Sequence, residues 1–554
     1  MTLTGVAGTA RAEQSSRPPG GAKRALGVAG LVFDVVAILA CAAWAARLSA
    51  GMDVSWDLLA YHQYYSWLFV EGHMHLADPE PYVNRYQSPL AELPWYLIDS
   101  HLSPRAATAV TAALAGVNLP LIRRITMRVA PSQLGPGGRW LLGVASCLLA
   151  GVGAVFSMEL GMSAGDVIVS IPMLGAVLLL LQAGRPGSSG RSAAWLYVGA
   201  GAPAGVAVGM KLTMANYAIG LGAAAVSLAV ARRTVRPVWC TAVGGVVGLA
   251  VSAGWWFADV WRLTGSPVFP FYNTIFHSPL WGDYDVRDDR FGAHGLMDAL
   301  SYPWLMAQGT PRVLDVPMRD LRWVLLAGLL LLAVAATSWR AARRRHGTRA
   351  DVGPLAAFWV FFAVSGVLWL FQFGIARYAV TSELLTGTAL VLCLVAVLRR
   401  PAVVLVVAAA LAVAMAPFNE GHFYHVPFQK GRFMVEAGPL RSVPLDSVVM
   451  AVNTSAPSGY LLEYLPAGTR RHIYQGWFAH SPLLAKLRNE QLSTAPHIYL
   501  VLGPAWPRQP RVRQELRDDV GLVVDDTRCL SVHSTLPVRH LCPARYVGVP
   551  TSRG

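Results

Sequence analysis

Charged side chains are scarce in this chain. Only 14% of its 554 residues are Asp, Glu, Lys or Arg, whereas 54% are hydrophobic. So large an apolar excess cannot be buried in one soluble core of this size, which indicates a multi-pass membrane protein. The net charge of +15 does not indicate nucleic-acid binding, because the arginines stand in short clusters between apolar runs, where membrane proteins carry their orientation signal.

Cysteine is also rare, and its six copies form neither a CxxC motif nor a Cys/His spacing typical of zinc. Cys529 and Cys542 lie in the polar C-terminal part, where they could form a disulfide if that part is extracytoplasmic. The remaining four lie in apolar runs and are expected to act as small hydrophobic residues. Walker, GxSxG and GxGxxG motifs are missing in strand–helix context, so the sequence supports no ATP, acyl-hydrolase or dinucleotide chemistry.

Long apolar runs, by contrast, are frequent. Those of spanning length, or close to it, fall at 25–48, 106–122, 139–157, 166–183, 194–210, 213–231, 238–259, 322–339, 354–372, 379–398 and 401–416. The first run is too long for a signal-peptide core and lacks a convincing cleavage site, so we interpret it as a retained anchor. We predict a mainly α-helical transmembrane domain over 25–416 with about 11 helices, preceded by a disordered cytoplasmic segment, 1–24.

Arginine clusters set the predicted orientation. With Lys23 and Arg24 in the cytoplasm, alternation of the helices places five further clusters on the same side, near 123–128, 185–191, 232–236, 340–345 and 399–400. The loops 49–105 and 260–321 and the tail 417–554 are then extracytoplasmic. Strand-like runs in the tail, such as SVVMAVN and HIYLVLG, alternate with polar stretches and predict a small α/β domain.

Several ionisable residues next to apolar runs are not explained by this topology, and all of them fall on the predicted outer face. Such residues are costly near the membrane and indicate function by default. The alternative is that they sit at helix ends, where long side chains reach the interface. They are Asp53 and Asp57 in the first loop, Glu159 and Asp166 in SMELGMSAGDV, Lys211 in GMKLT and Arg377 in ARYAVTSELL.

These residue types suit the transfer of a sugar from a lipid phosphate. A carboxylate can act as general base toward a hydroxyl, and lysine and arginine can hold a phosphate. If the segment is helical, Asp53, Asp57 and Tyr61 share one face, next to His62. The other interpretation of this stretch is an interfacial amphipathic helix whose acids face water and whose aromatic residues face lipid, and both can hold together.

Metal binding has weaker support. The HMH of His73 and His75, with Asp78 nearby, lacks a further convincing ligand. The DYDVRDD run at 283–289 lacks the glycine and terminal glutamate of an EF-hand loop. No metal ligand is assigned and no cofactor is predicted with certainty, while a divalent cation such as Mg²⁺ or Mn²⁺ stays open.

The layout and motifs together resemble the GT-C superfamily, integral-membrane glycosyltransferases that use polyprenyl-phosphate sugars. WDLLAYHQYYSWLFVEG, SMELGMSAGDV, GMKLT, GSPVFPFYNTIFHSP and ARYAVTSELL are similar to segments of largely uncharacterised bacterial proteins of this type, over most of residues 26–390. In the superfamily the catalytic acid lies in the first outer loop, near the end of the first helix. The resemblance therefore implies Asp57 as the catalytic acid, with Asp53 as the other candidate.

The resemblance also suggests the remaining roles. We expect acceptor-binding or orienting roles for Glu159, Asp166, His62 and Tyr61, and donor-phosphate binding by Lys211, Arg377 and Arg290. Composition suggests a high-GC bacterium, so arabinofuranose and mannose are candidate sugars by analogy.

The predicted function is transfer of such a sugar from polyprenyl phosphate to an envelope glycan, lipid or protein acceptor, at the outer face of the bacterial plasma membrane. The alternative is a transporter or flippase of lipid-linked sugars. It should place ionisable residues near mid-membrane on broken helices, often in internal repeats, and the chain shows no persistent repeat. A third hypothesis is a non-catalytic scaffold for envelope assembly, which would tolerate loss of Asp57, Lys211 and Arg377.

Overall fold

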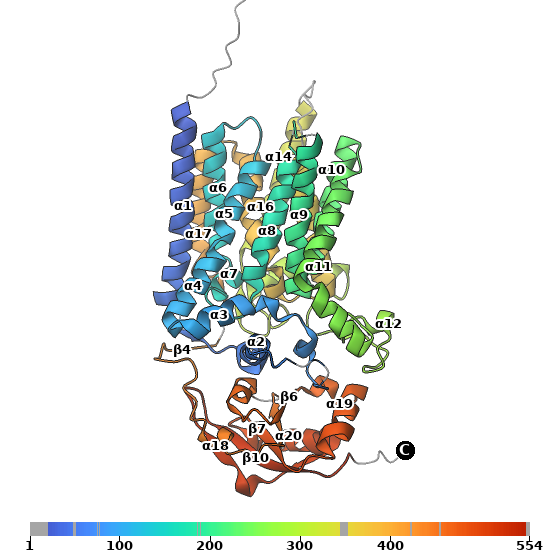
Figure 1. The fold of residues 1–554 in the computed structure, drawn as a ribbon. Helices are drawn as coiled ribbons and strands as arrows, with labels where there is room; N and C mark the ends of the chain where they lie inside the picture. The colour runs from blue at the N-terminus through green and yellow to red at the C-terminus, as the bar shows by residue number, and fades with distance from the viewer. Residues whose placement is uncertain are drawn as a thin grey trace, which may run out of the picture.

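The computed structural model describes residues 20–47, 51–74, 76, 78–185, 187–188, 190–343, 353–421, 424–453 and 456–549. Figure 1 shows a bundle of long helices and, at one end of it, a smaller domain formed by the C-terminal part of the chain. The segment 1–19, most of the predicted disordered terminus, lies outside the described residues, as does His75.

Within the described residues, nine helical segments are long and apolar enough to cross a membrane. They are α1 (Gly20–Arg47), α4 with α5 (Pro104–Gly116, Asn118–Val129), α8 (Asp166–Ala183), α9 (Gly190–Met210), η4 with α10 (Leu212–Met214, Ala215–Arg232), α11 (Arg236–Thr264), α14 (Arg322–Arg343), α15 (Gly353–Gln372) and η5 with α16 (Ala376–Ala379, Val380–Leu398).

The other two predicted spans are also helical but shorter. They form α6 (Pro136–Gly151) and α17 (Pro401–Met415), which lie beside α1 and α5 in the bundle (Figure 1). The predicted class, a mainly α-helical polytopic membrane protein, is therefore confirmed, with nine rather than eleven helices of full spanning length in the described part.

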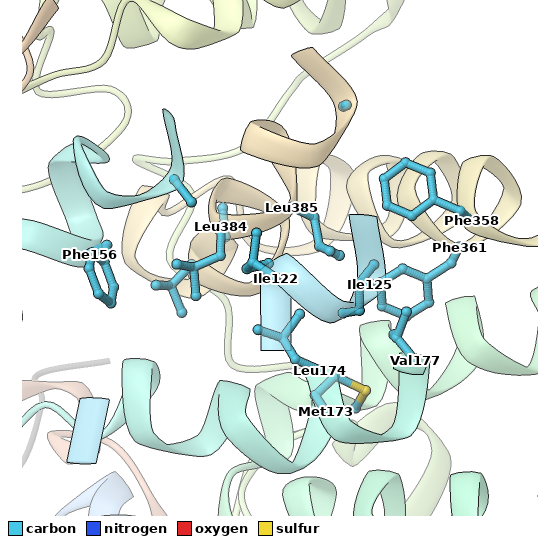
Figure 2. Close-up of a cluster of buried hydrophobic side chains, with 14 of the residues drawn as sticks. Ile122, Ile125, Phe156, Met173, Leu174, Val177, Phe358, Phe361, Leu384 and Leu385 are labelled. Carbon is cyan, nitrogen blue, oxygen red and sulfur yellow. The ribbon is translucent and has the colours of Figure 1, made fainter. Parts of the chain in front are cut away.

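Helix α16 is the centre of the bundle and is buried from Val380 to Val395. Figure 2 shows how neighbouring helices pack their apolar side chains around it, with Leu384 and Leu385 of α16 facing residues of α5, α8 and α15. Helices in lipid gain little from hydrophobic burial and associate through close packing. Accordingly, Gly201 and Gly205 bring α9 so close to α11 that an added Cβ would meet a backbone oxygen at 2.0 Å.

The two long loops and the start of the tail meet at one end of the bundle, opposite the first turn of α1 (Figure 1). The first loop contains β1 (Met52–Asp53), the π-helical turn η1 (Leu58–His62), α2 (Gln63–Val70), η2 (Val83–Tyr86), η3 (Pro89–Ala91) and α3 (Leu93–His101). The second loop contains α12 (Asn273–Phe276), α13 (Leu296–Gln308) and β2 (Met318–Arg319). Strand β1 pairs with β4 (His425–Val426) and β2 with β3 (Glu420–Gly421), so both loops are tied to the tail. We refer to this end as the loop end.

The C-terminal part folds into the predicted small α/β domain. Its sheet has the order β6-β5-β7-β10-β8, with β9 also on β10; β5, β6 and β7 are parallel, and β10 is antiparallel to its neighbours. Cys529 and Cys542 are disulfide-bonded, as the sequence allowed. The strands are β5 (Val448–Val452), β6 (Arg470–Tyr474), β7 (Ile498–Leu502), β8 (Leu522–Val524), β9 (Leu530–Val532) and β10 (Arg539–Tyr546), flanked by α18 (Gly438–Arg441), α19 (Pro482–Leu487) and α20 (Pro510–Glu515).

Candidate active site

Asp57 and Arg377 meet at the loop end although 320 residues separate them. Asp57 immediately precedes the π-helical turn η1, and Arg377 lies in η5, the first turn of the α16 span. One guanidinium nitrogen of Arg377 donates to Asp57 Oδ2 at 2.5 Å. The Asp57 side chain is 21% exposed, so its carboxylate is held in place and is still accessible.

A second charge pair lies directly beside the first. Lys211, between α9 and η4, places Nζ 2.8 Å from Oδ1 of Asp166 and also donates to the backbone oxygen of Ala164 at 3.1 Å. Asp166 begins α8 and is fully buried, and its Oδ2 lies 3.8 Å from Nε of Arg377. Asp57, Arg377, Asp166 and Lys211 thus form a chain of alternating charge, which we call the outer cluster.

Burial and neighbouring charges compete at the outer cluster. Burial would raise the pKa of Asp57, but Arg377, aided by Lys211, lowers it to a net value below the usual one. Burial likewise would lower the pKa of Lys211, but the Asp166 carboxylate raises it above its usual value. The Asp57 carboxylate and the Lys211 ammonium are therefore both charged at neutral pH.

Glu159 lies close to the outer cluster, but its pKa is shifted in the opposite direction to that of Asp57. It ends α7 (Ala154–Met158), is almost completely buried, and its Oε2 accepts from the backbone N–H of Val167 at 3.2 Å. Burial and the negative charge of Asp166 raise the pKa of Glu159 well above its usual value. Its Oε1 has no hydrogen-bond partner within the described part of the chain. Burial and Asp166 thus favour the protonated form of the Glu159 carboxyl group.

His62 is buried on the other side of η1. Its Nδ1 lies 3.0 Å from Oγ of Ser163, and its Nε2 lies 3.5 Å from Oε1 of Glu92. Burial lowers the pKa of His62 to about 3 and raises that of Glu92 to about 8, although Lys211 opposes the latter shift. Both groups are uncharged at neutral pH, so they position the η1 turn as neutral polar partners and do not form an ion pair.

Asp53 has a different environment from Asp57, because the stretch that contains them is not one helix, and the condition for their sharing a helical face is not met. Asp53 lies in strand β1 and is buried, and its two oxygens accept from the backbone N–H groups of Ser55 at 2.7 Å and Ser163 at 3.0 Å. The carboxylate is occupied by backbone donors because the chain turns sharply between β1 and η1. Asp53 therefore anchors the turn that follows Glu159, which leaves Asp57 as the accessible carboxylate.

Tyr61 and Arg290 are the remaining predicted site residues. Tyr61 packs in an aromatic group with Tyr65 and Tyr82, at ring-centroid distances of 6.3 and 5.7 Å, on the turn that follows Asp57. The guanidinium of Arg290 instead donates to Asp288 in the exposed second loop, at 2.9 and 2.6 Å. The structure brings Tyr61 to the site, whereas Asp288, the partner of Arg290, lies outside the outer cluster.

The C-terminal domain is fastened to the loop that carries Asp57, which sequence reasoning missed. Buried Glu80 accepts from the Tyr65 hydroxyl at 2.8 Å and from the backbone N–H of Ile473 in β6 at 3.0 Å. Gly459, which begins a 3₁₀ turn of the domain, lies so close to Ala60 in η1 that a Cβ would meet its backbone oxygen at 2.0 Å. The domain therefore braces the turn that presents Asp57.

Metal ligation has no visible site: no group of three or more His, Cys, Asp or Glu side chains that could hold an ion occurs among the described residues. A possible divalent cation thus has no assigned ligands in this part of the chain.

Fold and site together describe a polytopic membrane protein with paired acids and cations at one end. Among solved structures, the chain is similar to ArnT from Cupriavidus metallidurans bound to undecaprenyl phosphate, with 15% identity and a TM-score of 0.39 over 95% of this chain and 98% of that one. It is also similar to the apo state of the same protein, with 13% identity and a TM-score of 0.39 over 94% and 98%. The sequence matches no family profile and no curated protein. Likeness this distant carries no conclusion about the activity of the chain.

Proposed function

We propose that this protein is a membrane glycosyltransferase of GT-C type, which moves a sugar from a polyprenyl-phosphate donor to a hydroxyl of a cell-envelope acceptor. The observation that carries the proposal is the outer cluster, in which an accessible carboxylate and two cations meet at the loop end of the bundle. Arabinofuranose and mannose are the candidate sugars, and the acceptor is an envelope glycan, lipid or protein. The reaction takes place at the outer face of the plasma membrane, with the N-terminus in the cytoplasm and the C-terminal domain outside.

Asp57 has the properties of a general base. Its carboxylate is ionised at neutral pH and partly exposed, so it can accept the proton of an acceptor hydroxyl. The acceptor oxygen then attacks the anomeric carbon of the donor sugar as the bond from that carbon to the phosphate oxygen breaks. The proton ends on Asp57, and the negative charge of the broken bond ends on the lipid phosphate.

Lys211 and Arg377 are suited to hold that phosphate. Both are cations next to a buried carboxylate, Asp166, which keeps them in fixed positions and offsets part of the cost of burying them. Preorganised cations stabilise charge that develops on a leaving group without reorganising during the reaction. The raised pKa of Glu159, next to this pair, favours its protonated form, which would add no negative charge to repel the phosphate.

Donor binding also strengthens the base in this arrangement. Arg377 holds the pKa of Asp57 down against the effect of burial. A phosphate that binds Arg377 shares its positive charge, so the pKa of Asp57 rises toward that of a more effective base. In this proposal Tyr61, on the turn after Asp57, orients the acceptor, and buried His62 supports that role by positioning the turn.

The test is a transfer assay with the full-length protein in liposomes, supplied with radiolabelled polyprenyl-phospho-arabinose or polyprenyl-phospho-mannose and an extract of envelope glycans and lipids. We expect label to move from lipid phosphate to acceptor, and Asp57→Asn to reduce the rate by about 10²–10⁴-fold. The matched control is Asp289→Asn, because that side chain is 81% exposed and lies in the second loop.

Three results would overturn the proposal. Full transfer by a well-folded Asp57→Asn variant would show that Asp57 is not the general base. No transfer from either donor by the wild type would count against these donor sugars and the activity together. Movement of intact labelled lipid between leaflets without cleavage of the sugar bond would favour the flippase alternative.

A further inference from the structure

A separate cavity opens at the loop end, outside the outer cluster. It has a volume of about 550 Å³ and lies between the end of α2 with the loop that follows it and the last turns of α11. We call it the α11 groove. The side chains that give it its chemistry are Phe69, Met74, Trp255, Trp256, Asp259 and Arg262.

Aromatic faces stand next to hydrogen-bonding groups in the α11 groove. The rings of Phe69 and Trp255 are stacked, with centroids 6.0 Å apart and planes inclined by 25°, and Trp255 is 45% exposed. One and two helical turns along α11, Asp259 and Arg262 supply a carboxylate acceptor and guanidinium donors. A flat aromatic surface bordered by such groups fits a sugar ring, whose C–H face is apolar and whose hydroxyls both donate and accept.

The charge balance of the groove favours binding of a neutral sugar over binding of a phosphate. Asp259 Oδ1 lies 3.1 Å from Nη1 of Arg262, so the carboxylate offsets the guanidinium charge. An anionic headgroup would lie as close to the Asp259 carboxylate as to the Arg262 guanidinium. Repulsion by the first would then cancel much of the attraction by the second, so little electrostatic binding energy would result. Hydroxyl groups can bond to both partners at once, which favours an uncharged polyol.

The α11 groove and the outer cluster lie at the same end of the bundle, and α2 and α11 lead from one toward the other. Phe69 lies twelve residues after Asp57 along η1 and α2, a path of about 18 Å at the helical rise. On the other side, the indole N–H of Trp256 donates to the backbone oxygen of Tyr86 at 3.1 Å. Tyr86 and the next residue of α11, Phe257, line a second, small cavity of about 20 Å³ that reaches Lys211. A glycan held in the α11 groove would have to span about 18 Å for its end to reach the carboxylate of Asp57.

We propose that the α11 groove binds neutral sugar units of a glycan acceptor while the end of that glycan reaches Asp57. This inference rests on the proposed transferase function and narrows its acceptor from any envelope molecule to a glycan of several sugars. The groove supplies affinity for the acceptor, and the outer cluster supplies the chemistry.

Binding is measured by titration calorimetry, with the full-length protein in nanodiscs and tetrasaccharides of mannan, arabinan, galactan and glucan as probes. We expect at least one to bind, and Trp255→Ala to weaken its binding about tenfold, as expected for loss of an aromatic anchor. Asp259→Asn, which keeps the shape of the side chain, should also weaken it. Trp261→Ala is the control, because Trp261 is an exposed residue of the same helix that does not line the groove.

The results of the binding and transfer assays distinguish a failure of this inference from a failure of the proposed function. Asp57→Asn should keep saccharide binding while losing transfer, so binding can succeed even where catalysis fails. The inference is overturned if no tetrasaccharide binds the wild type, or if both groove variants bind as tightly as the Trp261→Ala control. Binding of glycerol phosphate that depends on Arg262 would also overturn it, since that result would make the groove an anionic headgroup site.

Discussion

Replacing Arg377 with glutamine should move the pH dependence of sugar transfer. Under the proposed function transfer requires ionised Asp57, so its rate should fall as the pH drops through the pKa of that group. In the wild type Arg377 opposes burial and keeps this pKa below the usual value of 3.8. An opposite charge at hydrogen-bond distance lowers an aspartate pKa by about 1–3 units, and each unit corresponds to about 1.4 kcal/mol. Without Arg377, burial dominates, and the acidic limb should move up by about 1–3 pH units.

The assay is kcat/KM for transfer between pH 3 and pH 8, measured for the wild type, Arg377→Gln and Lys211→Gln. Both variants lose a phosphate-binding cation, so both should be slower at every pH. Lys211 contributes less than Arg377 to the pKa of Asp57, so Lys211→Gln should shift the limb much less. An acidic limb that stays in place in Arg377→Gln, or that moves equally in both variants, would refute the assignment of Asp57 as the base controlled by Arg377.

Three further predictions concern the supports of the site. Glu80→Ala removes the two buried hydrogen bonds that Glu80 accepts and should lower stability by about 2–4 kcal/mol, measured by thermal unfolding with proteolysis of the C-terminal domain. Asp53→Asn can accept from only one of its two backbone donors, so it should cost about 1–3 kcal/mol, whereas Asp57→Asn should cost transfer and leave the melting temperature close to the wild-type value. Replacing Cys529 and Cys542 with alanine opens a bridge with a sequence separation of 13 and should cost about 3 kcal/mol in denaturant titrations. The corresponding prediction is contradicted if Glu80→Ala, Asp53→Asn or the double alanine variant is as stable as the wild type.

Sequence patterns were sufficient to predict the helices and much of the secondary structure of the C-terminal domain, because both depend on local hydrophobic periodicity. Every predicted span is helical, and the runs SVVMAVN and HIYLVLG contain β5 and β7. The two spans that are too short, α6 and α17, show the limit of this reasoning. Apolar composition does not determine where a proline or glycine starts or ends a helix within a run.

Contacts between distant residues could not be predicted from local pattern. Lys211 and Arg377 were singled out as cations between apolar runs, but nothing in their spacing shows that Asp166 lies between them. Asp53 and Asp57 are four residues apart and look equivalent in the sequence. They differ because the chain leaves a strand and enters a π-helical turn between them, so one carboxylate binds backbone N–H groups and the other faces Arg377. Glu80 was overlooked because its partner, Ile473, is 393 residues away.

The outer cluster also implies an order of events. Arg377 donates to Asp57, so the proposed base and one proposed phosphate-binding cation neutralise each other in this arrangement. An acceptor that bound first would meet a weak base, because Arg377 holds its pKa down. A donor that bound first would draw Arg377 toward its phosphate and raise that pKa before the acceptor hydroxyl arrives. Productive transfer should therefore follow donor binding.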